Sequence, residues 1–172
     1  MKSKLAIDGG TPVRPEPLRG GFHGSSEIAQ REIDAVVNVL RKKRLFRFLA
    51  KGSEESEAAK VEAWYRQRLG RKYALAVNGG TAALICAMYG IDVGPGDEVI
   101  IPAHTYVATP AAVIAAGAVP VICEVDASLN MDPVDLTTKI SPYTRAILPV
   151  HMRGVPARMD DIMAIANRHN IP

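Results

Sequence analysis

An apolar segment that ends in two glycines and a threonine is the part of this sequence best suited to bind a ligand. It reads Ala74-Leu-Ala-Val-Asn-Gly-Gly-Thr-Ala-Ala-Leu84, which predicts a strand over 74–77 and a helix that opens with Thr81. The first backbone N–H groups of such a helix attract an anion, and glycine lets the anion approach the backbone closely. The pattern indicates a phosphate site, with a tight strand-to-helix connection as the alternative.

Three further side chains that could bind a ligand or take part in catalysis follow later apolar runs. Tyr106 is suited to stack on a flat ligand, which contributes about 0.5–1.5 kcal/mol beyond the buried area. Packing within the protein is the alternative role for this ring. His104 and His151 are weaker candidates, because a histidine at the end of a strand is more often a hydrogen-bonded structural group than a catalyst.

Alternating strands and helices must position these residues. Apolar runs predict strands at 74–77, 98–101, 119–124 and 145–150, with helices near 81–90, 108–116, 134–139 and 159–169. Strands joined by connections of helix length pair in parallel, and ligands then bind at the carboxyl ends of the strands. Continuous apolar strands need cover on both faces. The expected fold class is α/β, a three-layer α/β/α arrangement with a mostly parallel sheet.

The chain before this alternation has a different pattern. Residues 1–24 are rich in proline and glycine, which predicts an extended arm. A helix is expected from Ser25, with one apolar face formed by Ile33, Val36, Val37 and Leu40. A second helix is expected from near Ser53 to Gly70, with an inner face formed by Ala58, Val61, Tyr65 and Leu69.

Composition narrows the class of protein. With 48% hydrophobic and 23% charged residues, the 172-residue chain has the balance of a globular domain. Its net charge of +3 is small and its aromatic residues are few, so we expect no nucleic-acid partner. We expect no metal site, because Cys86 and Cys123 have neither the spacing nor the setting of ligands and are interpreted as reduced core thiols. The absence of a signal-like or membrane-spanning stretch predicts a cytoplasmic protein without a membrane partner.

Several ordered motifs resemble one enzyme family. They are Gly96-Asp-Glu-Val-Ile-Ile-Pro-Ala-His-Thr-Tyr-Val-Ala-Thr109, Ala116-Gly-Ala-Val-Pro-Val121 and Leu148-Pro-Val-His-Met-Arg-Gly-Val-Pro-Ala-Arg-Met-Asp160. Together they resemble the DegT/DnrJ/EryC1/StrS aminotransferases, and Leu5-Ala-Ile-Asp-Gly-Gly-Thr-Pro12 is similar to the N-terminal arm of that family. The resemblance implies a fold type I transferase that depends on pyridoxal 5'-phosphate. It also implies an amino-acid donor and a keto-sugar or keto-cyclitol acceptor, in the biosynthesis of antibiotics or surface polysaccharides.

The same resemblance implies roles for individual residues. Gly80 and Thr81 match the residues that hold the cofactor phosphate, and Tyr106 matches the ring that stacks on the pyridine. His151 matches a histidine on the substrate side, without a firm role. Gly79 and Arg153 depart from the family pattern, since serine and an aromatic residue are common at these positions.

The family's remaining catalytic residues have no match in this chain. The resemblance implies that the aspartate at the pyridine nitrogen and the Schiff-base lysine lie beyond residue 172, so no catalytic residue is expected within the chain. Residues 25–172 are then the N-terminal part of the cofactor-binding large domain, and the chain alone is expected to be inactive. A truncated product, a sequence fragment and one part of a split enzyme are all compatible with this expectation. A complete version is expected to be a homodimer.

Two other functions compete with the aminotransferase interpretation. A non-catalytic regulatory or assembly protein could keep the phosphate-binding turn without the lysine. A nucleotide-binding module is the second alternative, but Asn78-Gly-Gly-Thr-Ala-Ala83 matches neither G-x-G-x-x-G nor G-x-x-x-x-G-K-[ST].

Overall fold

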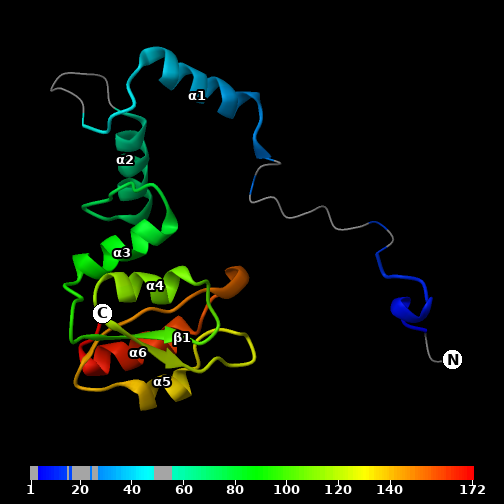
Figure 1. The fold of residues 1–172 in the computed structure, drawn as a ribbon, viewed down its shortest axis with the longest axis vertical. Coiled ribbons are helices and arrows are strands. Elements are labelled where there is room, and N and C mark those ends of the chain that lie inside the picture. The colour runs from blue at the N-terminus through cyan, green and yellow to red at the C-terminus, as the bar shows by residue number, and fades with distance from the viewer. Residues whose placement is uncertain (1–3, 15, 17–23, 25–26, 49–55) are drawn as a thin grey trace. The chain divides into compact units, whose positions relative to one another are not determined.

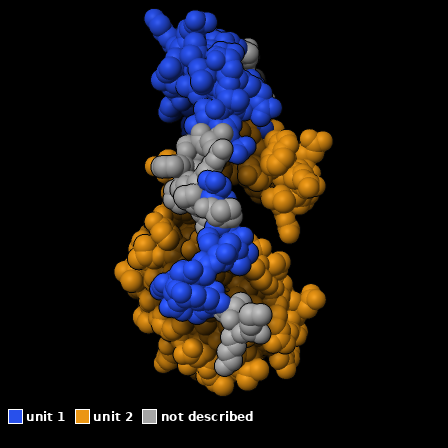
Figure 2. All heavy atoms as spheres, turned by 90° about the vertical axis from the view of Figure 1, so that its right-hand side faces the viewer, with its two compact units in different colours: residues 1–60 blue, residues 61–172 orange. Residues whose placement is uncertain are grey.

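The computed structural model describes residues 4–14, 16, 24, 27–48 and 56–172. The chain divides into two compact units, residues 1–60 and residues 61–172, which Figure 2 distinguishes by colour. The boundary that we predict at residue 24, between an arm and a large domain, stays a prediction. The two units are described separately below.

The first unit contains a short 3₁₀ turn and an amphipathic helix. The 3₁₀ turn η1 (Ala6–Asp8) ends at Gly9, which has a φ of 85°. Helix α1 (Gln30–Lys42) begins where the Ala29 N–H donates to Glu32 Oε2 over 2.9 Å. The predicted helix is therefore confirmed, although its expected start at Ser25 lies outside the described residues. None of the residues of α1 is buried, and three residues of its predicted apolar face are exposed, namely Ile33, Val36 and Leu40.

Helix α2 (Glu57–Leu69) is capped at its start by a serine. The Ser56 hydroxyl accepts a hydrogen bond from the Ala59 N–H over 3.2 Å, as an N-cap residue does. The expected start near Ser53 lies outside the described residues, whereas the predicted end is confirmed, because Gly70 has a φ of 61°.

The inner face that we predict for α2 is wrong. Val61, Tyr65 and Leu69 are about half exposed, at 48%, 48% and 61%. Glu62 is buried on this helix instead, with 2% exposure. The apolar residues lie around an open groove that the described residues do not fill, and the carboxylate makes the inward contact.

The second unit is built on a parallel sheet. Strands β1 (Glu98–Pro102), β2 (Val119–Cys123) and β3 (Thr144–Ile147) pair in the order β2-β1-β3, and both pairs are parallel. Glu98 lies opposite Val119 on one side and opposite Thr144 on the other. The parallel arrangement predicted for these three strands is confirmed.

The strand predicted at 74–77 is wrong for this structure. These residues join no ladder among the described residues, although their sequence is apolar. A strand needs a neighbour to receive its backbone hydrogen bonds, and the order of the sheet leaves 74–77 without one. The apolar sequence of residues 74–77 alone therefore could not decide whether they form a strand.

The predicted helices of this unit are confirmed. They are α3 (Gly80–Gly90), α4 (Ala108–Ala115), α5 (Pro133–Lys139) and α6 (Met159–His169), with the 3₁₀ turn η3 (Met152–Gly154) before the last. Helix α5 shows how local sequence sets such a start. Asp132 accepts from the Val134 N–H over 3.0 Å, while Pro133 occupies the first helical position.

Side chains of β1 alternate between two helical layers. Ile100 faces a cluster with residues of α5 and α6, whereas Val99 and Ile101 face a cluster with residues of α3 and α4. Figure 1 shows α4 on one side of β1 and α5 and α6 on the other. The three-layer α/β/α class predicted from the sequence is confirmed. Among the described residues, no helix combines the length and apolar character needed to cross a membrane.

The connection between α4 and β2 requires glycine at position 117. Gly117 has a φ of 83°, and a Cβ there would lie 3.0 Å from the Cγ of Pro95. We expect Gly117→Ala to lower the free energy of unfolding by about 1–3 kcal/mol, because backbone strain and steric contact add. Urea denaturation measures this loss. Gly90→Ala is the control, since nothing lies within 4 Å of its added Cβ and its φ is not positive; an equal loss there would contradict the argument.

Candidate functional site

The N-terminal end of α3 is open on the structure. The Ala83 N–H donates to the Gly79 carbonyl over 3.0 Å and is the first intrahelical donor, so the N–H groups of residues 80–82 have no acceptor within the helix. Within the described part of the chain, no side chain caps this end. Three amide donors and the positive end of the helix dipole therefore meet at residues 80–82, which is the arrangement that binds a phosphate.

Neither glycine at this end is required by the chain itself. Gly79 has an extended φ of 179°, and Gly80 has no positive φ. A Cβ added to either residue would meet nothing within 4 Å. The glycines therefore leave free space in front of the amides, and a phosphate group fits the residues present.

Thr81 lies in the first turn of α3, where its exposed side chain carries a hydroxyl next to the amides. This position agrees with the sequence prediction that the hydroxyl contacts a phosphate. The contact itself remains a prediction.

Tyr106 lies in the loop between β1 and α4, and 74% of it is exposed. Its carbonyl accepts from the Thr109 N–H over 3.0 Å, while the hydroxyls of Thr105 and Thr109 lie 2.8 Å apart. Because Thr109 is buried, these contacts fix the loop to the start of α4. The ring is free of the core, which argues against the packing role, and stacking on a cofactor remains a prediction.

His151 has a structural contact in the loop after β3. Its Nδ1 accepts a hydrogen bond from the Ala157 N–H over 3.0 Å, so we assign the ring proton to Nε2. The imidazole closes the loop from 151 to 157, as expected of a hydrogen-bonded histidine at the end of a strand. The substrate-side position implied by the resemblance remains a prediction. His104 is exposed.

Sequence reasoning missed Asn130, which forms hydrogen bonds with the same loop. Asn130 is 1% exposed, accepts from the Met152 N–H over 2.9 Å and donates to the Val155 carbonyl over 3.3 Å. The partners are 22 and 25 residues away, so no local spacing could reveal them. Buried amides of this kind fix loop geometry because their hydrogen bonds cannot be exchanged for water.

The acidic residues after β2 are also used by the loops. The pKa of Asp126 is lowered by hydrogen bonds from the Ser128 hydroxyl and backbone N–H. The pKa of Asp135 is lowered by the backbone N–H of Glu124, which lies 2.8 Å from its Oδ2. Both carboxylates act as acceptors that shape turns, and a lowered pKa makes them weak general bases.

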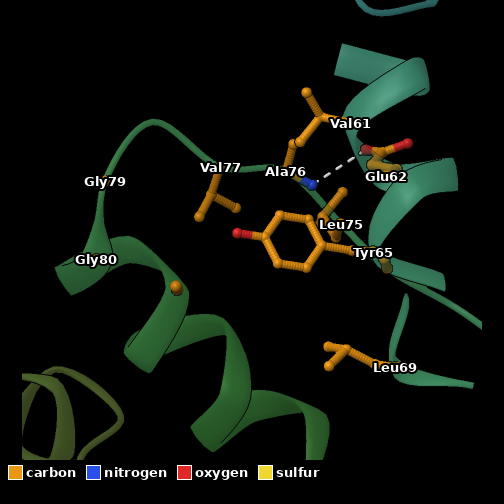
Figure 3. Close-up of a pocket in the computed structure, with 11 residues that line it drawn as sticks. Val61, Glu62, Tyr65, Leu69, Leu75, Ala76, Val77, Gly79 and Gly80 are labelled. Carbon is orange, nitrogen blue, oxygen red and sulfur yellow. Dashed lines mark hydrogen bonds between the residues drawn. The ribbon is translucent and has the colours of Figure 1, made fainter. Parts of the chain in front are cut away.

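A groove of about 570 Å³ lies beside the glycine turn, between α2 and α3. Figure 3 shows Tyr65 and Leu75 pointing into it, with Gly79 and Gly80 at one end. Its lining is mainly apolar and comprises Val61, Glu62, Tyr65, Leu69, Ala74, Leu75, Ala76, Val77, Gly79, Gly80 and Ala83. Glu62 is the second residue that sequence reasoning missed.

The two cysteines differ in burial. Cys123 is fully buried, and desolvation, followed by the charge of Asp135, raises its thiol pKa to about 12. Cys86 is exposed on α3, so the prediction of a core thiol is wrong there; its face of the helix is not covered by described residues.

This difference predicts selective modification. At pH 8, iodoacetamide should alkylate Cys86 in the folded chain and leave Cys123 intact, because the reagent reacts with an accessible thiolate. The raised pKa also makes stability depend on pH. Between the ordinary thiol pKa and about 12, Cys123 ionises in the unfolded chain but stays neutral in the folded chain, so the free energy of unfolding falls as the pH rises. Peptide mass spectrometry reads out the alkylated sites. Equal labelling of both cysteines in the native chain would show that Cys123 is accessible.

The parallel sheet between helical layers places the protein in the α/β class. The sequence profile of the DegT/DnrJ/EryC1/StrS aminotransferase family matches residues 26–172. The chain belongs to this family, and the sequence-based resemblance is confirmed.

Individual relatives agree with this assignment. The chain is 34% identical over 180 residues to an L-glutamine:2-deoxy-scyllo-inosose aminotransferase of Streptomyces paromomycinus, an alignment that covers 100% of the chain and 40% of the relative. It is 47% identical over 100 residues to a dTDP-3-amino-3,4,6-trideoxy-alpha-D-glucose transaminase of Streptomyces venezuelae, covering 58% of the chain and 26% of the relative. Its relatives thus act on sugars and cyclitols.

Solved structures show the same fold with cofactor. NtdA of Bacillus subtilis, solved with the bound cofactor PMP, superposes with a TM-score of 0.71 at 32% identity, over 84% of this chain and 33% of that chain. Other neighbours were solved in PLP and PMP forms. The chain spans about two fifths or less of the length of these relatives.

Proposed function

We propose that this chain supplies the phosphate-binding part of a pyridoxal-phosphate-dependent aminotransferase that acts on a keto-sugar or keto-cyclitol. The observation that carries the proposal is the uncapped, glycine-lined start of α3, where free amides and open space coincide. The names of the relatives support the substrate class, and the PMP-bound neighbour supports the cofactor.

Each residue of the proposed site has a physical task. The amides of residues 80–82 and the Thr81 hydroxyl hold the phosphate, because they donate hydrogen bonds to its oxygens. Tyr106 keeps the pyridine ring in a fixed plane. The bound cofactor supplies an electron sink for transfer of an amino group. The lysine and the pyridine-nitrogen aspartate implied by the resemblance are not assigned to residues of this chain, so we propose that the chain alone is inactive.

The proposed function also includes the two substrates of the enzyme. The relatives' names support a keto-sugar or keto-cyclitol acceptor, with an amino acid as the nitrogen donor. A homodimer, the absence of nucleic-acid and membrane partners, and a cytoplasmic location remain predictions of the sequence analysis.

Binding of pyridoxal phosphate to the purified chain tests the proposal. Fluorescence titration should show binding of pyridoxal phosphate and much weaker binding of pyridoxal, which lacks the phosphate. Thr81→Ala should weaken the binding of pyridoxal phosphate about tenfold or more, since a hydrogen bond to a charged group contributes about 1.5–3 kcal/mol. Thr137→Ala, a control on α5 whose hydroxyl donates to the Val134 carbonyl, should leave binding unchanged.

Two outcomes would contradict this function. If pyridoxal and its phosphate bind equally, the start of α3 is not a phosphate site. If ATP raises the melting temperature and pyridoxal phosphate does not, the nucleotide-binding alternative is supported instead.

A further inference from the structure

A buried carboxylate on α2 contacts the segment that leads into the glycine turn. Glu62 is 2% exposed, and its Oε1 accepts a hydrogen bond from the Ala76 N–H over 3.1 Å. Figure 3 shows this bond at the edge of the apolar groove, with Gly79 and Gly80 further along the same segment. The two bonded residues are 14 positions apart, so the contact joins separate elements.

The burial of this carboxylate needs a reason. Apolar residues are the ordinary choice for the buried face of a helix, and a buried carboxylate is costly without hydrogen bonds. Most of the groove beside Glu62 has an apolar lining, and a hydrogen bond in such surroundings is stronger than the same bond in water. The Ala76 N–H is therefore a strong partner for Glu62.

Glu62 contacts a segment that lies outside the described sheet. Residues 74–77 join no ladder among the described residues. Gly79 follows three residues after Ala76, so their Cα atoms lie at most about 11 Å apart. Fixing Ala76 therefore limits where the start of α3 can lie relative to α2.

We propose that Glu62 is a positioning residue for the phosphate-binding turn, acting through the Ala76 amide without touching the ligand. This inference rests on the proposed function of the turn. The carboxylate holds residues 74–77 against α2, and the turn at Gly79 and Gly80 then presents its amides in one geometry. Loss of the acceptor releases the segment and spreads the amides over several geometries.

Three variants of the full 172-residue chain test the proposal. Glu62→Ala removes the acceptor, whereas Glu62→Gln keeps an oxygen at the same reach. Glu57→Ala makes the same change at an exposed site on the same helix, where the side chain pairs with Lys60 over 2.8 Å. The measurements are hydrogen–deuterium exchange of the amides from 74 to 82 and equilibrium binding of pyridoxal phosphate and pyridoxal.

We expect Glu62→Ala to speed hydrogen–deuterium exchange of the Ala76 amide about tenfold or more, because one hydrogen bond to a charged group is lost. The affinity for pyridoxal phosphate should fall to a similar extent. Binding of pyridoxal should change much less, since it lacks the phosphate. Glu62→Gln should restore both values to within about threefold of the parent, and Glu57→Ala should match the parent. Rescue by glutamine separates positioning from a general loss of packing.

Unchanged exchange and unchanged binding in Glu62→Ala would overturn the proposal. If Glu62→Ala fails to fold, Glu62→Asp replaces it, because its carboxylate is one methylene too short for the same bond; protection of Ala76 equal to that of the parent would then overturn the proposal. If the parent does not prefer pyridoxal phosphate to pyridoxal, the proposed function fails. Faster exchange at Ala76 in Glu62→Ala, rescued by glutamine, would still show the positioning contact.

Discussion

Replacing Gly80 by aspartate should abolish the binding of pyridoxal phosphate and leave the fold intact. A carboxylate at the first position of α3 lies where the phosphate is proposed to bind. Two like charges about 4 Å apart repel by about 4 kcal/mol at a protein surface, which corresponds to a loss of affinity of roughly a thousandfold.

Gly80→Asp should not lower the stability of the folded protein. A Cβ at position 80 meets nothing within 4 Å, and the backbone there has no positive φ. An acidic residue in the first turn stabilises a helix by about 0.3–1 kcal/mol. Stability and affinity should therefore change in opposite directions, which distinguishes a binding effect from unfolding.

Gly80→Asn is the matched control, because asparagine has nearly the same size without the charge. Titration with pyridoxal phosphate and urea denaturation of both variants give the two quantities. The charge-based interpretation is wrong if asparagine and aspartate weaken binding equally. A loss of stability in Gly80→Asp would show instead that the start of α3 is not open.

The second large effect is expected in the core below the sheet. Ile100 on the central strand β1 is 0% exposed and packs in the cluster that contains Leu136 and Ile162. Ile100→Ala should lower the free energy of unfolding by about 2–5 kcal/mol, because the lost burial and the remaining cavity both add. Such a loss is a large fraction of the stability of an ordinary domain.

Ile122→Ala on β2 makes the same substitution at a residue that is 50% exposed. We expect a loss below about 1.5 kcal/mol there, since half of the side chain already contacts solvent. Urea denaturation followed by circular dichroism compares the two variants. Equal losses would mean that β1 is not the centre of the sheet.

Local sequence determined most of the second unit. Asp132 and Pro133 fix the start of α5, and Gly117 fixes the turn into β2, because capping and backbone preference act over a few residues. Continuous apolar runs identified the three strands of the sheet, and connections of helix length required them to be parallel. The glycine turn was also readable, since an open helix start depends on residues that are adjacent in the chain.

Tertiary structure decided the features that depend on distant partners. The segment 74–77, predicted as a strand, finds no neighbouring strand among the described residues, so an apolar pattern like that of the sheet strands did not produce a strand there. The burial of Glu62 and Asn130 depends on amides 14 and 22 residues away, and neither partner is visible in local spacing. Sequence patterns indicate which apolar side chains prefer burial. A polar side chain can be buried only where the fold brings its hydrogen-bond partner within reach, so its burial depends on the tertiary structure.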